Sequence, residues 1–179
     1  MIATDLPMTQ DEIVALIHAD TEKVFTTMLG IEAVPCPNAT PVEPAGENGG
    51  VVALVGFAGQ WVGSGSVHCS ATLACIITGK FLMADYDHVN DEVLDAMGEV
   101  ANMIIGNFKD DAADKLGPLG LSTPTVIHGK NFQTRNWGGQ SWVTVPFDCE
   151  GELFEVKICL IPGHKAHDLF RPVSTTVGL

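Results

Sequence analysis

The sequence predicts an α+β fold in which an antiparallel sheet of about six strands carries long helices. Two stretches, residues 51–69 and 141–161, have the pattern of β-hairpins, because β-prone runs flank short glycine-containing turns. Other stretches place apolar residues every three or four positions, which is the helical pattern. Helices and hairpins occupy separate parts of the chain, and this segregation favours α+β with an antiparallel sheet.

The first helix is expected to begin after Thr9 and to end at Gly30. Thr9-Gln-Asp-Glu12 matches a capping box, and apolar residues follow at near-helical spacing until the glycine. A short strand is expected over residues 31–34. Residues 35–50 are rich in proline and glycine and predict an exposed loop.

Two further helices follow the first hairpin. Residues 71–82 are mostly apolar and follow Ser70, a suitable N-cap. Residues 92–108 form the longest helical pattern, and either Asn90 or Asp91 can cap it.

The element order hints at an internal duplication. After an irregular stretch at 109–123, residues 124–127 predict a strand, and residues 141–147 and 153–161 predict the second hairpin. Helix, short strand and hairpin thus occur twice, with the helix at 71–82 between the two sets. Residue identity between the hairpins is weak, so this possible α-β-β-β repeat rests on element order.

Length and charge limit the class of protein. A chain of 179 residues and 19.0 kDa suits a single domain, residues 1–179. With 22 acidic and 9 basic side chains the formal net charge is −13, which disfavours nucleic acid and anionic membrane surfaces as partners. Without a signal-peptide pattern or a long apolar run, the chain is expected to be cytoplasmic.

Several kinds of site lack their sequence patterns. The five cysteines are an odd number without zinc-ligand spacing, which predicts neither disulfides nor a metal site: Cys36, Cys69, Cys75, Cys149 and Cys159. Gly63-Ser-Gly65-Ser lies within a β-prone segment and lacks the lysine of a phosphate loop. Nucleophilic chemistry by Ser-His-Asp or Cys-His stays open, although no nucleophile elbow is present.

The helix expected over residues 92–108 carries one polar stripe. At roughly 100° per residue, four residues share its outward side: Asp95, Glu99, Asn102 and Gly106. The opposite arc is apolar and predicts the core face: Val93, Met97, Val100, Ala101, Ile104 and Phe108, with Leu94 and Ile105 at its edge.

Small residues flank the stripe. Gly98 costs roughly 1 kcal/mol of helix propensity relative to alanine. With Ala96 and Gly106 it predicts a surface that a partner's backbone can approach closely. A Glu and an Asn one turn apart also occur on ordinary solvated helices, so spacing alone does not decide for a functional site.

The longer string resembles the signature of the CheC/CheX/FliY phosphatase superfamily, and most closely that of CheX. In this signature an Asp or Ser, a Glu and an Asn lie on one helix, and a Pro follows later. Here four residues take these places: Asp95, Glu99, Asn102 and Pro124. The most specific pieces are Gly-Glu-Val-Ala-Asn-Met-Ile-Ile-Gly and Pro-Thr-Val-Ile-His-Gly. The interval to Pro124 is slightly shorter than in the family.

The resemblance implies a chemotaxis phosphatase, a hydrolase of two-component signalling that dephosphorylates the phosphoaspartate of a CheY-like response regulator. Asn102 would orient the attacking water, and Glu99 would pair with the regulator's lysine. Asp95, Gly98 and Gly106 would contact the partner. The chain would need no metal or cofactor of its own, because the response regulator supplies Mg²⁺.

The resemblance also implies a homodimer that pairs through its sheets, and a single site. Residues 22–25 of the first helix read Glu-Lys-Val-Phe and lack the asparagine, which is the one-site CheX arrangement. The alternative is a non-catalytic member of the superfamily that binds a receiver domain or a flagellar-switch partner. The presence of both Glu99 and Asn102 favours the phosphatase.

Overall fold

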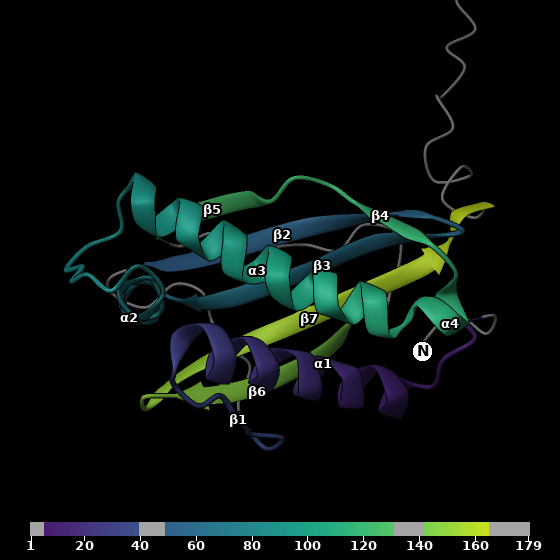
Figure 1. The fold of residues 1–179 in the computed structure, drawn as a ribbon, viewed down its shortest axis with the longest axis horizontal. Coiled ribbons are helices and arrows are strands. Elements are labelled where there is room, and N and C mark those ends of the chain that lie inside the picture. The colour runs from purple at the N-terminus through teal and green to yellow at the C-terminus, as the bar shows by residue number, and fades with distance from the viewer. Residues whose placement is uncertain (1–5, 40–48, 131–141, 165–179) are drawn as a thin grey trace, which may run out of the picture.

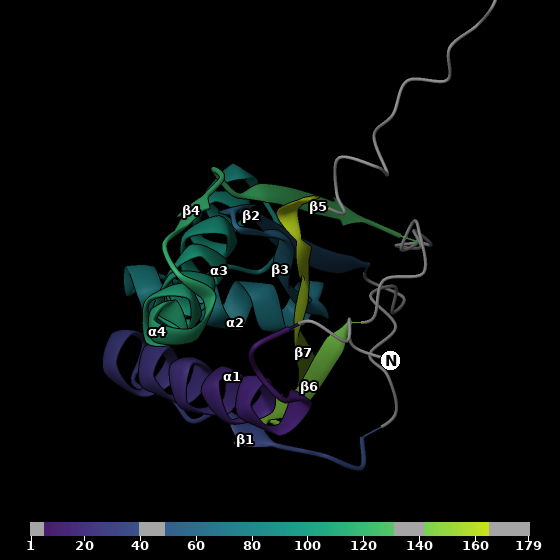
Figure 2. The ribbon, with the colours of Figure 1, turned by 90° about the vertical axis from the view of Figure 1, so that its right-hand side faces the viewer.

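The computed structural model describes residues 6–39, 49–130 and 142–164. In this part of the chain, α-helices pack on one face of a single antiparallel sheet (Figures 1 and 2). The α-helices are α1 (Gln10–Val24), α2 (Ala71–Leu82), α3 (Asp91–Asp111) and the short α4 (Ala113–Leu116). The strands are β1 (Val34–Pro35), β2 (Gly50–Gly59), β3 (Trp61–Ser70), β4 (Leu119–Leu121), β5 (Thr125–Gly129), β6 (Val143–Cys149) and β7 (Glu152–Pro162).

The expected cap begins helix α1. The Thr9 hydroxyl accepts the Glu12 N–H at 3.2 Å, and the Glu12 carboxylate accepts the Thr9 N–H at 2.9 Å, which completes the capping box. After Val24 the helix widens into a π turn, η1 (Phe25–Leu29). The chain then leaves through Gly30, whose φ of 66° is the left-handed conformation typical of a glycine at a helix end.

The caps of α2 and α3 are also those expected from the sequence. The Ser70 hydroxyl accepts the Leu73 N–H at 3.0 Å, and the Asn90 side chain accepts the Val93 N–H at 3.0 Å. Helix α3 runs three residues beyond the predicted end.

The sheet has seven strands in the order β1-β6-β7-β3-β2-β4, and β5 pairs with β2 beside β4. The α+β prediction is therefore confirmed, with β4 as a strand that the sequence did not predict. Both hairpins form as expected. The predicted strand at 31–34 is shorter and lies at Val34–Pro35, and the one at 124–127 begins and ends later. Residues 40–48 of the predicted loop and residue 141 of the second hairpin lie outside the described residues.

The strand order supports an internal duplication. Strands β3 and β7 pair at the centre, and each is the second strand of its hairpin. Strand β1 of the first half pairs with β6 of the second, and β5 of the second half pairs with β2 of the first. Exchanging the two halves therefore reproduces this strand order, with the exception of β4. This symmetry favours the internal repeat that the order of elements in the sequence suggested.

Helices α1 and α3 bury corresponding residues. Ile13, Ile17 and Val24 of α1 are buried, and so are the residues 80 positions later: Val93, Met97 and Ile104. On this alignment the places of Glu99 and Asn102 are taken on α1 by Ala19 and Glu22. This alignment moves the counterpart of the stripe from residues 22–25 to residues 19–22, and neither stretch contains an asparagine.

The core lies between the helices and the sheet and is rich in aromatic and branched side chains. Phe154 of β7 stacks on Phe25 of η1 and on Phe147 of β6, with ring centroids 4.9 and 5.1 Å apart. Among the residues that the structure describes, no helix combines the length and the apolar character that crossing a membrane requires.

Candidate functional site

Helix α3 directs its apolar arc into the core, as its sequence predicts. Six residues expected on that arc are buried, and so is one expected at its edge: Val93, Met97, Val100, Ala101, Ile104, Phe108 and Ile105. Because these contacts fix the rotation of the helix, the opposite stripe faces outward.

The stripe presents a carboxylate and a carboxamide together. Asp95 and Glu99 are exposed, whereas Asn102 and Gly106 are partly buried. Glu99 and Asn102 are one turn apart, a spacing that places Cβ atoms about 5–6 Å from each other on a helix. Within the described residues neither side chain has a hydrogen-bond partner or an ion pair. Both groups are therefore available to a visiting molecule.

The segment from the end of β4 to the start of β5 runs beside the stripe. A Cβ added at Gly98 would lie 3.4 Å from Pro124 and from Val126, and one at Gly106 would lie 3.9 Å from Leu121. Gly98, Asn102 and Gly106 form one ridge of the helix, since they are four residues apart. Asn102 thus projects from the ridge between the two points where the segment contacts it.

Hydrogen bonds to β2 hold this segment in place. The Ser122 N–H donates to the Gly56 carbonyl at 2.9 Å, and the Ser122 hydroxyl accepts the Gly56 N–H at 2.8 Å. The site's edge is therefore part of the sheet. The sequence analysis identified Pro124 only through the family resemblance. Nothing in the local sequence around Ser122 predicted that Ser122 contacts β2.

The sequence predicted that a partner would approach the small flanking residues, but two of them are covered by this chain itself. Ala96 and Gly98 are buried within the chain itself, and Gly98 lies against Pro124 and Val126. A partner's backbone cannot reach Gly98, because strand β5 already covers it. Its small size allows α3 and β5 to pack closely, while Gly106 stays partly exposed.

The helix surface around the site is acidic. Four exposed carboxylates lie in its first three turns: Asp91, Glu92, Asp95 and Glu99. Lys109, the one basic residue of α3, pairs with the neighbouring Asp110 at 2.9 Å. This charge favours a partner that brings a lysine or arginine to the stripe.

The stripe can pair with a cationic group and can orient a water molecule. Within residues 6–39, 49–130 and 142–164, no three His, Cys, Asp or Glu side chains are grouped to hold a metal ion. A carboxylate and a neutral carboxamide can respectively pair with an ammonium group and orient water.

Solved structures share this fold. CheX from Vibrio vulnificus is 28% identical, with a TM-score of 0.73 over 86% of this chain and 99% of that one. A CheC-like superfamily protein from Shewanella sp. PV-4 is 27% identical, with a TM-score of 0.73 over 86% and 99%. A chain of the CheX–CheY–BeF3–Mg²⁺ complex from Borrelia burgdorferi, 24% identical over 83% and 97% with a TM-score of 0.70, shows the same fold.

A family comparison assigns the chain more directly. Comparison with curated protein sequences gave no match. The model of the family described as chemotaxis phosphatase CheX matches residues 51–148, which is more than half of the chain and includes all of helix α3 and strand β5. The chain therefore belongs to the chemotaxis phosphatase CheX family.

Proposed function

We propose that this chain accelerates hydrolysis of the phosphoaspartate on a CheY-like response regulator, with Asn102 and Glu99 as its functional groups. The observation that carries the proposal is a carboxylate and a carboxamide on the outward side of α3, neither of which is paired with another described residue. Membership of the chemotaxis phosphatase CheX family supports it. The complex from Borrelia burgdorferi, in which a CheX is bound to CheY with BeF3 and Mg²⁺, supports a response regulator as the partner.

Asn102 is proposed to orient the attacking water. A response regulator brings its own Mg²⁺ and lysine, which neutralise the phosphoryl oxygens, so the missing component is a water in line with the scissile P–O bond. A neutral carboxamide can hold this water without repelling the phosphoryl anion. Asn102 stands on a rigid helix beside a hydrogen-bonded segment, so its position costs little ordering when a partner arrives.

Glu99 is proposed to pair with the regulator's lysine, which fixes the register of docking. The pair would form in a partly desolvated interface, where a charge-assisted hydrogen bond is stronger than on an open surface. Asp95, one turn earlier and exposed, is proposed to contribute to the same docking surface.

Replacing Asn102 by alanine tests the proposal. A misplaced water costs about 100-fold or more in rate, so Asn102→Ala is expected to lose the accelerated phosphate release and to keep its affinity for a phosphorylated receiver domain. Asn107→Ala is the matched control, because Asn107 lies on the same helix, is also partly buried and points to a different side. Phosphate release by Asn102→Ala at the wild-type rate would refute the proposal.

The same assay separates the alternative, a non-catalytic protein that binds a receiver domain or a flagellar-switch partner. Such a protein binds a phosphorylated receiver without shortening the lifetime of its phosphoaspartate. The homodimer implied by the resemblance also stays a proposal, which light scattering of the purified chain would check.

A further inference from the structure

The end of helix α2 exposes a large apolar side chain in a conformation that is unfavourable for it. Met83 is 94% exposed and Leu82 is 46% exposed. Met83 adopts φ 54° and ψ 44°, the left-handed conformation in which glycine is normally found, and its N–H donates to the Gly79 carbonyl. Neither the exposure nor the backbone conformation of Met83 stabilises the folded state. Binding to a partner therefore explains this residue better than folding does.

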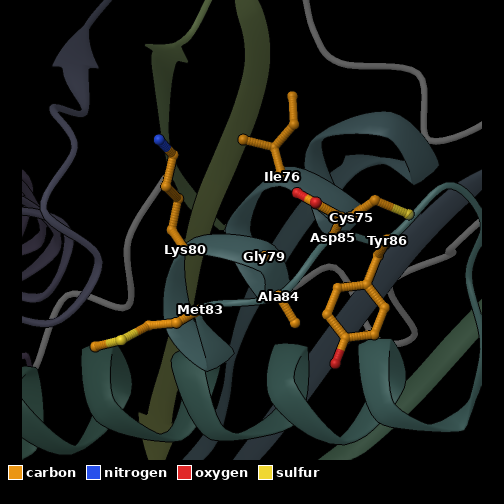
Figure 3. A pocket seen from close by; sticks show the side chains of 8 residues that line it. All are labelled: Cys75, Ile76, Gly79, Lys80, Met83, Ala84, Asp85 and Tyr86. Atoms are coloured by element: carbon orange, nitrogen blue, oxygen red, sulfur yellow. The ribbon is translucent and has the colours of Figure 1, made fainter.

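A hollow lies beside this side chain. It measures about 450 Å³, and residues from the end of α2 and from the following turn line it (Figure 3): Cys75, Ile76, Gly79, Lys80, Met83, Ala84, Asp85 and Tyr86. Gly79 keeps the turn tight, because a Cβ there would lie 2.8 Å from the Ala84 carbonyl oxygen. The lining combines apolar atoms with the Asp85 carboxylate and the Lys80 amine.

The hollow and the α3 stripe belong to the same side of the molecule. Helix α2 points along the line of sight in Figure 1, so it crosses α1 and α3 steeply and ends at the outer side of the helical layer. The Tyr86 hydroxyl donates to the Glu92 carboxylate at 3.1 Å, which ties the turn to the first turn of α3. In Figure 3 the Met83 side chain extends away from Cys75 and Tyr86.

We propose that Leu82, Met83 and the hollow form an apolar docking contact for the same receiver domain that the α3 stripe engages. This inference rests on the proposed function, because the occupant is the partner of that site. The receiver would place an apolar side chain against Met83, whose unbranched thioether adapts to different shapes. The contact would set which receiver is bound, while Asn102 sets the rate of hydrolysis.

The negative charge of this face favours a receiver domain as the occupant over a second copy of this chain. Four exposed carboxylates, against the one lysine that lines the hollow, lie in the turn after α2 and in the first turn of α3: Asp85, Asp87, Asp91 and Glu92. Two copies that met through this face would bring these carboxylates together, which is repulsive in a chain with a net charge of −13. A partner with a basic residue beside its apolar one is complementary.

Replacing Met83 by glycine tests the inference without weakening the fold. Glycine relieves the left-handed strain, so Met83→Gly is expected to raise the melting temperature and to weaken binding about 5- to 20-fold. The probe is the receiver domain that the wild-type chain dephosphorylates fastest, activated with beryllofluoride and titrated by calorimetry. Met83→Leu, which keeps an apolar side chain, is expected to retain most of the affinity.

Val34→Ser is the matched control, because Val34 is an exposed apolar residue on the opposite edge of the sheet, and it is expected to bind like the wild type. At saturating receiver, Met83→Gly is expected to hydrolyse phosphoaspartate at the wild-type rate. Wild-type affinity in Met83→Gly would overturn this inference and leave the proposed function intact. Activity retained in Asn102→Ala would instead overturn the proposed function.

Discussion

Glu99 and Asn102 differ in charge, and this difference separates their expected effects. Glu99→Gln keeps the shape of the side chain and removes the charge that would pair with the regulator's lysine. A charge-assisted hydrogen bond contributes about 1.5–3 kcal/mol, so the affinity for a phosphorylated receiver is expected to fall about 10-fold or more. Its dependence on salt is also expected to weaken, because one ion pair is lost.

Titration of the receiver at low and high ionic strength checks this expectation for Glu99. Asp114→Asn removes the same charge from an exposed residue of α4, away from the stripe, and serves as the control. If both variants lost affinity equally, the effect would belong to the overall charge of the chain and Glu99 would have no specific partner.

A second residue-scale feature is a carboxylate in the core. Asp20 of α1 is 1% exposed, and neither of its oxygens has a hydrogen-bond partner within the described residues. Burial, together with the nearby charge of Asp111, raises the pKa of Asp20 from 3.8 to about 7. The folded state therefore holds this proton more tightly than the unfolded state.

The raised pKa of Asp20 predicts that stability falls with rising pH. Below pH 3.8 the carboxyl is protonated in both states. Between pH 3.8 and about 7 only the unfolded state loses the proton, so the free energy of unfolding drops by up to about 4 kcal/mol and then levels off. Asp20→Asn is expected to remove this slope and to stabilise the protein at pH 8.

Urea denaturation of the wild type and of Asp20→Asn at pH 5 and pH 8 measures the effect. Asp111→Asn removes only the neighbouring charge and is expected to reduce the slope without abolishing it. An Asp20→Asn variant with the wild-type pH dependence would show that the carboxyl is already charged in the core, against this expectation.

At the scale of elements, Gly65 of β3 allows α3 to lie close to the sheet. The Cβ of an alanine at position 65 of β3 would overlap the Ile105 side chain, at 2.8 Å from its Cγ1 and 3.0 Å from its Cγ2. Gly65→Ala is therefore expected to destabilise the protein by about 1–3 kcal/mol, as overpacking does in a close-packed core.

A double-mutant cycle checks this contact. In Gly65→Ala/Ile105→Ala the smaller side chain leaves room for the new methyl group, so the loss is expected to be smaller than the sum of the two single losses. Additive losses would mean that the two residues do not compete for the same space. Because Ile105 is one turn from Asn102, the single variant Gly65→Ala is also expected to lower the proposed phosphatase activity.

Local signals predicted most of the helices and strands, whereas the contacts between them were not predictable. Thr9, Ser70 and Asn90 cap helices through bonds to residues three positions later, so the sequence contains the whole signal. Strand β4 pairs with β2 from 60 to 64 residues away, and its Gly-Pro surroundings resemble a loop. A neighbour of Gly98 likewise comes from β5. The sequence therefore showed that this residue is small, but it did not show that the small size lets β5 pack against α3.

At the scale of the whole molecule, the pairing of β3 with β7 joins the two repeated halves. These two strands come from different hairpins and contact each other along nine residue pairs, from Trp61 opposite Pro162 to Cys69 opposite Phe154. The α3 site lies over the first half's hairpin but belongs to the second half by sequence. The site therefore depends on the two halves staying together.

Gly63 lies where β3 approaches the backbone of β7 closely. A Cβ at this position would overlap the backbone carbonyl of Cys159 in β7, and a backbone group cannot turn aside as a side chain does. Gly63→Ala is therefore expected to force β3 and β7 apart and to cost about 3 kcal/mol or more of stability. Gly120→Ala is the control, because its Cβ would lie 3.5 Å from the Ala58 carbonyl oxygen, an ordinary contact. This variant is expected to change stability by at most about 0.5 kcal/mol.

Amide hydrogen exchange of the two variants tests whether the halves separate. Separation in Gly63→Ala exposes the amides of both β3 and β7, so these amides are expected to exchange faster than in Gly120→Ala. Equal exchange in the two variants would contradict the separation of β3 from β7.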